Sequence, residues 1–374
     1  MNKVYLDNAA TSALRPEVIQ EMTRVLTQEY GNPSSTHSSG RSAKNTLELA
    51  RKSIAKNLNA TAQEIIFTSG GTEGNNWILR SAVRDLKITR IITSKIEHHA
   101  VLYAVLALQN EFKIQVDFVN LQADGTVDLT HLVELLGQER KTLVSLMHVN
   151  NEIGSILDLH RVGVICQEHS ALFHTDAVQS VGKLALDLSQ LPIDFLVASA
   201  HKFHGPKGVG FAYIRKNSGL QPLFFGGEQE KGLRAGTEAL HQIAGMAHAL
   251  TLSYDSLIED EQHIKLLKSY LLKSLEDSFP GIRVNGPADG LHTVVNILLP
   301  FPESKTAMIL FHLDMKGIAV SRGSACQSGS IKPSHVLAEI LSGEDLKKPS
   351  LRVSLSQYNT KEDIDLFVQA LQAI

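Results

Sequence analysis

Short apolar segments alternate with segments of helical periodicity between residues 65 and 214, and this alternation limits the fold more than any other feature. The apolar segments are typical of buried strands and lie at 65–68, 90–94, 116–120, 142–149, 171–176, 193–200 and 209–214. The segments with helical character lie at 73–84, 100–111, 132–136 and 156–169. Strands separated by helices predict an α/β fold, with a mainly parallel seven-stranded sheet covered on both faces. Such a sheet binds its ligands at the carboxyl ends of its strands.

The pattern changes after about residue 255. Leucine and isoleucine residues at helical spacing over 264–275 predict one long helix, and shorter strand segments follow at 293–299, 318–321 and 351–354. A chain of 374 residues is too long for one simple core. We therefore expect a large domain at 15–255 and a smaller α+β domain that includes 256–374.

Charge and cysteine content exclude several classes of protein. The formal net charge is −3 and the pI is about 6.6, so no basic field indicates binding to nucleic acid or to an anionic membrane. The first residues lack the apolar core of a signal peptide, and no run is apolar for long enough to span a bilayer. The two cysteines, Cys166 and Cys326, are too few for a disulfide framework, and no metal-ligand spacing is present. We expect a cytoplasmic protein without a bound metal.

Two polar residues follow buried strand segments. Lys202 comes after the segment 193–200, and Asp176 ends the segment 171–176. A lysine at the end of a buried strand is poorly hydrated, which favours the uncharged amine that can form a Schiff base with an aldehyde. Taken alone, Lys202 would more often be a surface lysine that follows a strand. Together, Lys202 and Asp176 match a pyridoxal phosphate site, which needs a lysine for the aldehyde and a carboxylate for the pyridine nitrogen.

The residues around Asp176 and Lys202 extend this pattern. In sequence order they are Asp176-x-x-Gln179 and then Ser199-x-His201-Lys202-x-x-Gly205-Pro206-Lys207-Gly208. The pattern resembles the class V aminotransferases, which are fold-type I pyridoxal phosphate enzymes, and among them the cysteine desulfurases of the NifS/IscS type. The resemblance implies a large domain with a mainly parallel seven-stranded sheet and a smaller α+β domain. It also places residues 1–14 with the smaller domain.

The same resemblance assigns contacts with pyridoxal phosphate to specific positions. These are Gly71, Thr72, His98, Asn151, Asp176, Gln179, Ser199, His201, Lys202 and Thr237. The Gly-Gly turn at 69–73 lies between a strand and a helix, where backbone N–H groups and the helix dipole favour an anion such as phosphate. His98 is expected to stack on the cofactor ring and to move protons, with His99 as the competing candidate. Thr237 is expected to reach the phosphate of a neighbouring subunit, which implies a homodimer.

Cys326 and Arg352 carry the expected substrate chemistry. Cys326 lies in the small, polar run 321–330, where a thiol is accessible and reactive, whereas Cys166 lies among apolar residues and fits a buried filler. The run around Cys326 resembles the active-site loop of group I cysteine desulfurases. Arg352 matches the arginine that binds the substrate carboxylate bidentately, with Asn151 beside it.

The resemblance implies a desulfurase that converts L-cysteine to L-alanine, with a persulfide on Cys326. The sulfur acceptor would be an iron–sulfur scaffold or a protein of tRNA thiolation. A class V aminotransferase, a selenocysteine lyase and a non-catalytic sulfur carrier are the alternatives. The sequence departs from the family pattern at Val178, Arg322 and Ser356, where smaller residues are expected. It also ends at Ile374, without the C-terminal extension of longer members.

Overall fold

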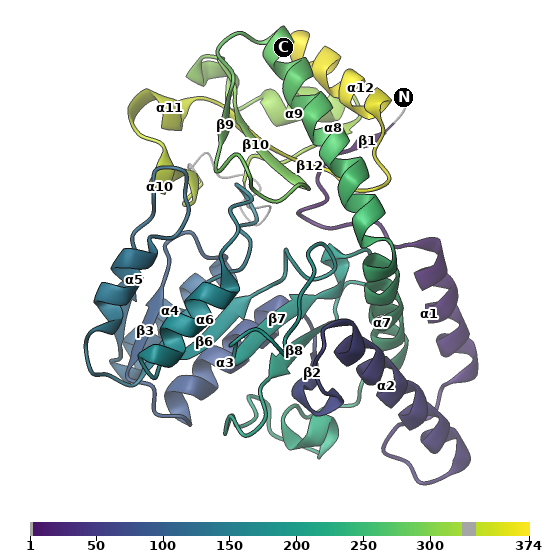
Figure 1. Cartoon of the computed structure of the whole chain (residues 1–374). Helices are drawn as coiled ribbons and strands as arrows, with labels where there is room; N and C mark the ends of the chain where they lie inside the picture. Colours follow the sequence, from purple (N-terminus) through teal and green to yellow (C-terminus); the bar gives the residue numbers. More distant parts are fainter. Residues whose placement is uncertain (1–2, 324–333) are drawn as a thin grey trace.

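The predicted sheet is present in the computed structural model, which describes residues 3–323 and 334–374 (Figure 1). Its strands are β2 (Ile65–Thr68), β3 (Arg90–Thr93), β4 (Gln115–Phe118), β5 (Thr142–Ser145), β6 (Leu172–Asp176), β7 (Phe195–Ser199) and β8 (Gly210–Ile214). They lie in the order β2-β8-β7-β6-β5-β3-β4. β8 runs antiparallel to β2 and β7, and the other neighbouring pairs are parallel. The prediction of a mainly parallel seven-stranded sheet is confirmed.

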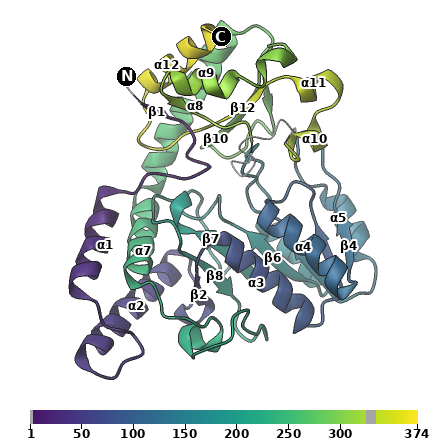
Figure 2. The ribbon, with the colours of Figure 1, turned by 180° about the vertical axis from the view of Figure 1, so that it is seen from behind.

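Helices cover both faces of this sheet. They are α1 (Pro16–Gln28), α2 (Ser38–Asn57), α3 (Gly71–Arg84), α4 (His99–Phe112), α5 (Leu129–Leu136), α6 (Leu159–Glu168) and α7 (Leu240–Asp255). Leu143 of β5 packs into the core with α3 and α4, which lie in front of the sheet in Figure 2. The next residue, Val144, packs on the opposite face into the core that includes α2, α5, α6 and α7. Because side chains alternate between the faces of a strand, a sheet with helices on both faces is apolar at successive positions.

Two helices differ from the sequence-based expectation. The segment 156–169 becomes helical only at Leu159, because the carboxylate of Asp158 accepts a hydrogen bond from the backbone N–H of Arg161 and caps the helix there. α7 was not predicted: its residues 243–247 are all buried, so no apolar stripe distinguishes one side of the helix.

Among the helices of the described residues, none is both long enough and apolar enough to cross a membrane.

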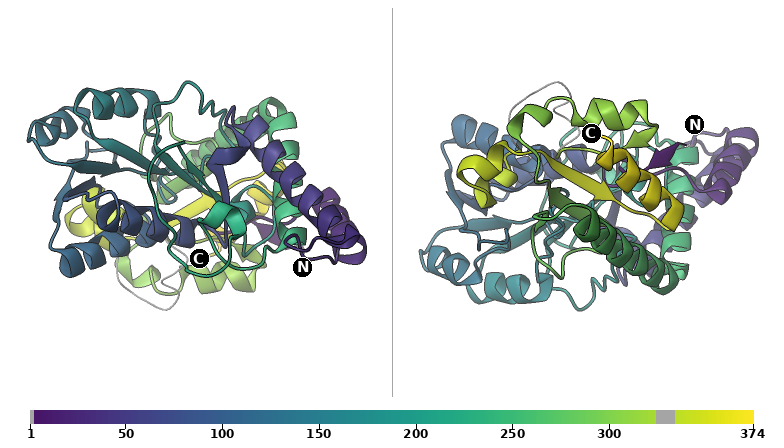
Figure 3. Two further views of the ribbon diagram at one scale, coloured as in Figure 1. Left: turned by 90° about the horizontal axis from the view of Figure 1, so that it is seen from below. Right: turned by 90° about the horizontal axis from the view of Figure 1, so that it is seen from above.

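A second core lies above the sheet in Figure 1 and contains both ends of the chain. Its elements are β1 (Val4–Tyr5), α8 (Leu257–Ser278), β9 (Arg283–Asn285), β10 (Val294–Leu298), α9 (Ile309–Met315), β11 (Ile318–Ala319), β12 (Ser350–Ser354) and α12 (Lys361–Gln372). The short helices α10 (Leu337–Ile340) and α11 (Gly343–Lys347) instead pack in a separate apolar cluster with Ile96 and Ile153. β12, β10 and β9 form an antiparallel sheet in that order, and β1 pairs in parallel with β11. α8 and α12 lie side by side in the view from above (Figure 3). The predicted domain boundaries, 15–255 for one domain and 1–14 with 256–374 for the other, stay a prediction.

Two neighbouring strands of the large sheet end at the edge that faces the second core (Figure 1). Asp176 is the last residue of β6, and Ser199 is the last residue of β7. The short 3-10 helix Ala200–Lys202 follows β7 directly. The fold therefore brings the predicted carboxylate and the predicted lysine to one edge of the sheet, where parallel sheets bind their ligands.

Candidate active site

A cavity of about 250 Å³ opens where β6 and β7 end. Its walls come from the first turn of α3, the start of α4, the turn after β5, strand β12 and the loop after β1. All but two of the predicted site residues line it, namely Gly71, Thr72, His98, Asn151, Asp176, Gln179, Ser199, His201, Lys202 and Arg352. Residues from distant parts of the sequence thus surround one space.

The amine of Lys202 is held by the loop that follows β1. Its Nζ donates hydrogen bonds to the carbonyl oxygens of Ala9, at 2.7 Å, and Ala10, at 2.8 Å. The same loop is attached to the 3-10 helix by a hydrogen bond from the backbone N–H of Ser12 to the carbonyl oxygen of His201, at 2.9 Å. The N-terminal loop therefore fixes the direction in which the Lys202 side chain extends into the cavity.

The carboxylate of Asp176 is fixed at both of its oxygens. Oδ2 accepts a hydrogen bond from Nδ2 of Asn75 at 2.7 Å, and Oδ1 accepts one from the backbone N–H of Val178 at 3.0 Å. Asn75 is fully buried and was missed by the sequence analysis. It lies four residues after Gly71 on α3, so it is on the same helix face as the Gly-Gly turn, and this spacing was the available signal. The two contacts orient Asp176 toward the cavity.

The first turn of α3 has the form of an anion-binding turn. Gly70 has a φ of +145°, a conformation that side chains other than glycine rarely adopt. A Cβ built on Gly70 would lie 3.4 Å from Oγ of Ser199, so the hydroxyl group is next to this turn.

Burial, together with the charge of Lys202, lowers the pKa of His201 to about 4. His201 is therefore neutral at pH 7 and keeps one N–H to donate to an anion.

Gly71→Ala should weaken the binding of the expected ligand, pyridoxal phosphate, about tenfold. A Cβ on Gly71 would lie 2.8 Å from Cγ2 of Val178, so either the side chain of Val178 or the helix start must shift into the cavity. Fluorescence titration of the apoprotein measures the affinity. The double variant Gly71→Ala/Val178→Ala should recover most of it, with Val178→Ala as the control. Equal affinity of wild type and Gly71→Ala would contradict this prediction.

His98 is both a helix cap and a wall of the cavity. Its Nδ1 accepts a hydrogen bond from the backbone N–H of Ala100 at 3.1 Å, which caps α4. Burial lowers the pKa of His98, the nearby Asp176 raises it, and Lys202 lowers it further, with a net decrease. Because Nδ1 is an acceptor, the proton of the neutral ring lies on Nε2.

The competing candidate, His99, does not line the cavity. Its ring stacks on Tyr103, with centroids 4.6 Å apart, and contacts the ring of His335 at 4.4 Å. The geometry therefore favours His98 over His99 as the residue beside a bound ligand.

In the part of the chain that the structure describes, no group of three or more His, Cys, Asp or Glu side chains is placed to hold a metal ion.

Arg352 reaches the cavity from β12 and joins three segments of the chain. Its guanidinium is buried; Nη2 donates to Oδ1 of Asp7 at 2.8 Å, and Nη1 donates to the carbonyl oxygen of Asn151 at 2.9 Å. Asp7 was not among the predicted residues, because nothing in its local sequence indicates a partner so far along the chain. Arg352 is thus an oriented cation beside Asn151, suited to binding a carboxylate.

Gln179 connects the cavity to a half-buried lysine that was also missed. Its Nε2 donates to the carbonyl oxygen of Ala9 at 2.9 Å, and its Oε1 accepts from Nζ of Lys183 at 3.0 Å. Burial, together with the charges of Lys202 and Arg352, lowers the pKa of Lys183 to about 7. These contacts fix which end of the Gln179 amide faces each neighbour.

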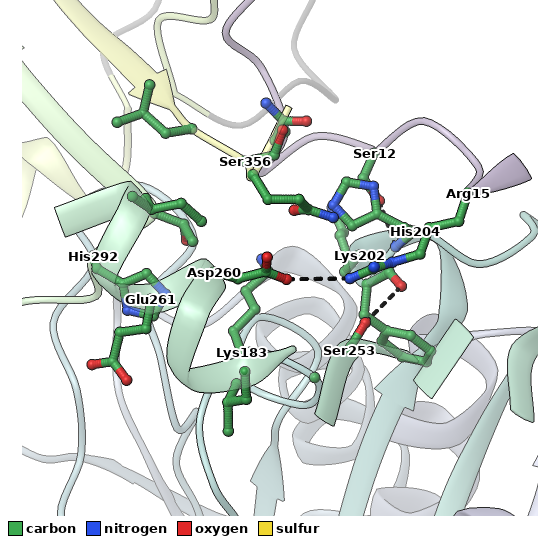
Figure 4. A pocket seen from close by; sticks show the side chains of 18 residues that line it. Ser12, Arg15, Lys183, Lys202, His204, Ser253, Asp260, Glu261, His292 and Ser356 are labelled. Carbon is green, nitrogen blue, oxygen red and sulfur yellow. Dashed lines mark hydrogen bonds and ion pairs between the residues drawn. The ribbon is translucent and has the colours of Figure 1, made fainter. Parts of the chain in front are cut away.

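A second cavity, of about 40 Å³, lies between α8 and the loop after β1 (Figure 4). Lys202 borders this cavity as well as the larger one. Arg15 and Asp260 form an ion pair at its edge, at 3.3 Å. Burial lowers the pKa of His204 and of His292 to about 4, so both rings are neutral at pH 7. The smaller cavity is lined by polar groups but leaves little room for anything larger than water.

Two predicted site residues lie outside the larger cavity. Thr237 is exposed in the loop before α7 and does not line the cavity of its own chain. Cys326 lies outside the described residues. The other cysteine, Cys166, is buried in α6, and burial raises its pKa to about 12, in agreement with the prediction of a buried filler.

Comparisons with known proteins agree with this geometry. The family model described as Aminotransferase class-V matches residues 4–367. A protein of Dictyoglomus turgidum named "Cysteine desulfurase IscS" is 41% identical over 375 residues, covering 100% of this chain and 94% of that protein. A solved structure titled "NIFS-LIKE PROTEIN" has a TM-score of 0.92 and is 35% identical, covering 100% of this chain and 99% of that one. Another, titled "SspA in complex with cysteine", has a TM-score of 0.82 and is 30% identical, covering 96% of this chain and 100% of that one. The chain belongs to the aminotransferase class-V family and, within it, to the cysteine desulfurases of the IscS and NifS type.

Proposed function

We propose that the protein is a pyridoxal phosphate-dependent cysteine desulfurase, which converts L-cysteine to L-alanine and leaves a persulfide on Cys326. The observation that carries this proposal is the meeting of Lys202, Asp176 and Arg352 in one cavity. A lysine amine and a carboxylate suit the cofactor, and a buried guanidinium suits the carboxylate of an amino acid. The related structure titled "SspA in complex with cysteine" supports L-cysteine as the substrate.

The residues of the cavity fit pyridoxal phosphate. Gly71 lacks the Cβ that would meet Cγ2 of Val178 at 2.8 Å. The proposed phosphate ligands are the backbone N–H groups and hydroxyl or imidazole donors of Gly71, Thr72, Ser199 and His201. The proposed ring contacts are Asp176 at the pyridine nitrogen, Gln179 and Asn151 at the phenolic oxygen, and His98 on the ring face. When bound, the cofactor supplies a sink for the electron pair that remains on the substrate Cα after loss of its proton.

The protein's own groups orient the substrate and move its protons. The guanidinium of Arg352 binds the substrate carboxylate. This carboxylate then takes over part of the guanidinium's contact with the carboxylate of Asp7. Nζ of Lys202 takes the proton from the substrate Cα, because an amine whose direction is fixed by backbone carbonyl groups can act as a general base at that carbon. Nε2–H of His98 is a further donor that lines the same cavity.

The sulfur transfer is a substitution at the sulfur atom of the substrate. The thiolate of Cys326 bonds to that sulfur, the Cβ–S bond breaks, and its electron pair stays with carbon, which takes up a proton to become a methyl group. The Cα then regains the proton that Lys202 had taken. L-Cysteine and the Cys326 thiol thus give L-alanine and the Cys326 persulfide. Every atom is accounted for, and no external oxidant or reductant is needed.

Purified protein that has been loaded with pyridoxal phosphate should release L-alanine from L-cysteine and hold a persulfide on Cys326. Cys326→Ser should lower alanine formation at least about 100-fold, because the sulfur then has no thiolate to attack it. Cys166→Ser is the matched control and should keep the wild-type rate, since this thiol is buried in α6. Amino acid analysis and mass spectrometry of the labelled persulfide are the measurements. A 2-oxo acid product together with full activity of Cys326→Ser would indicate an aminotransferase instead.

We further propose a cytoplasmic homodimer that passes its sulfur to an acceptor protein, for iron–sulfur cluster assembly or tRNA thiolation. The exposed position of Thr237, away from the cavity of its own chain, supports a role at the phosphate site of a second copy. A reducing compartment suits chemistry that depends on a free thiolate. Sedimentation of the loaded protein tests the dimer.

A further inference from the structure

A glutamate lies in the turn that is proposed to hold the cofactor phosphate. Glu73 is the third residue of α3, and its side chain is largely buried. Its Oε2 accepts a hydrogen bond from the backbone N–H of Ser69 at 2.8 Å, so the carboxylate lies against the Gly-Gly turn. Burial raises the pKa of Glu73, but hydrogen bonds from Arg234 and Ser69 lower it by more, so the group is an anion at pH 7. An anion at this place repels a phosphate group that binds the same turn.

Arg234 supplies a cation to this carboxylate from the loop between β8 and α7. Its Nε donates to Oε1 of Glu73 at 2.9 Å, and its Nη2 donates to Oε2 at 3.2 Å. Two parallel hydrogen bonds between a guanidinium and a carboxylate are the strong geometry for such a pair. Arg234 therefore cancels the charge of Glu73 directly beside the turn.

A second, buried ion pair anchors the loop that carries Arg234. Nη1 and Nη2 of Arg51 each donate to one oxygen of Glu230 at 2.7 Å, and the backbone N–H of Phe67 donates to Oε2 of Glu230 at 2.7 Å. Glu230 and Lys231 have φ angles of +48° and +62°, a strained conformation that persists only where the surroundings hold it. Glu230 thus has its own cation, and the fixed loop leaves Arg234 for Glu73.

We propose that Arg234 is a positioning residue for the cofactor phosphate, which neutralises Glu73 so that a phosphate dianion can bind at the first turn of α3. This inference rests on the proposed function. An acidic residue in the first turn of a helix stabilises that helix by itself, so Glu73 needs a partner only because an anion binds beside it. A purely structural ion pair needs both partners equally, whereas charge compensation needs Arg234 only while Glu73 is charged.

The experiment compares two ligands of the full chain as apoprotein: pyridoxal phosphate, and pyridoxal, which has the same ring and aldehyde but no phosphate. Arg234→Gln should weaken the binding of pyridoxal phosphate about tenfold, because the charge of Glu73 then opposes the phosphate. Its affinity for pyridoxal should stay within about threefold of wild type, which also shows that the variant is folded. Arg80→Gln, which removes a two-bond pair with Glu111 on the surface of the same helix, is the matched control. It should match wild type with both ligands in the fluorescence titration.

Glu73→Gln separates charge compensation from a structural role. Its amide oxygen still accepts a hydrogen bond, but the negative charge is gone, so this variant should bind pyridoxal phosphate at least as tightly as wild type. The double variant Glu73→Gln/Arg234→Gln should return to within about threefold of wild type, because Arg234 then has no charge to cancel. Arg234→Lys keeps the cation and should also bind pyridoxal phosphate within about threefold of wild type.

Three results would overturn the inference and leave the proposed function in place. They are wild-type affinity of Arg234→Gln for pyridoxal phosphate, an equal loss of affinity for pyridoxal, and a loss in Glu73→Gln or in the double variant as large as that in Arg234→Gln. Failure of the wild-type apoprotein to bind pyridoxal phosphate would instead overturn the proposed function, and the inference with it.

Discussion

Lys202→Ala should reduce the release of L-alanine from L-cysteine by about 10,000-fold or more. The substitution removes both the amine that bonds to the aldehyde of the cofactor and the base at the substrate Cα. The backbone carbonyl groups of Ala9 and Ala10, which bind Nζ, cannot replace either function. Alanine formation measures the loss of the base. Retention of pyridoxal phosphate after gel filtration measures the loss of the bond to the aldehyde, and the variant should lose cofactor that the wild type keeps.

Two controls separate amine chemistry from charge. Lys202→Arg keeps a positive charge, but a guanidinium does not lose its proton in a protein, so this variant should be about as inactive as Lys202→Ala. Lys207→Ala changes an exposed lysine of the same motif and should keep wild-type activity and cofactor. Activity of Lys202→Ala within tenfold of wild type would refute the role of this lysine.

The central pair of the site could be predicted because it depends on local sequence and on one rule of sheet topology. Asp176 and Lys202 each follow an apolar run that forms a buried strand. β6 and β7 are parallel neighbours, so their carboxyl ends meet at the same edge of the sheet. The positions of the two groups at strand ends were therefore enough to predict that they lie close together.

The contacts that orient these groups could not be predicted in the same way. Lys202 and Gln179 both bind the carbonyl oxygen of Ala9, and a backbone carbonyl carries no signature in the identity of its residue. The ion pair between Asp7 and Arg352 joins the two ends of the chain, and its geometry depends on how β12 packs beside the loop after β1. Such contacts follow from tertiary packing, so the sequence indicates which groups gather but not how they are held.

Acidification should destabilise the folded protein strongly between pH 7 and pH 5, partly through two buried histidines. Burial lowers the pKa of His174 to about 3 and that of His148 to about 4, whereas an unfolded histidine titrates near 6.5. Below pH 6.5 the unfolded chain binds protons that the folded chain does not bind, so stability is lost as the pH falls from 6.5 toward these lowered values. Each ring should contribute a loss of about 2 kcal/mol in the free energy of unfolding between pH 7 and pH 5. Urea unfolding of the loaded protein at several pH values measures the loss.

His174→Gln tests the contribution of one ring. Nδ1 of His174 shares a hydrogen bond with Oγ of Ser145 at 2.8 Å, so the variant should be less stable than wild type at pH 7. Between pH 7 and pH 5, however, it should lose about 2 kcal/mol less than wild type, because glutamine does not titrate. His160→Gln, on the exposed side of α6, is the control and should follow the wild-type pH dependence. A parallel pH dependence of His174→Gln and wild type would show that this ring is protonated in the folded state, because only then do both states bind the same proton.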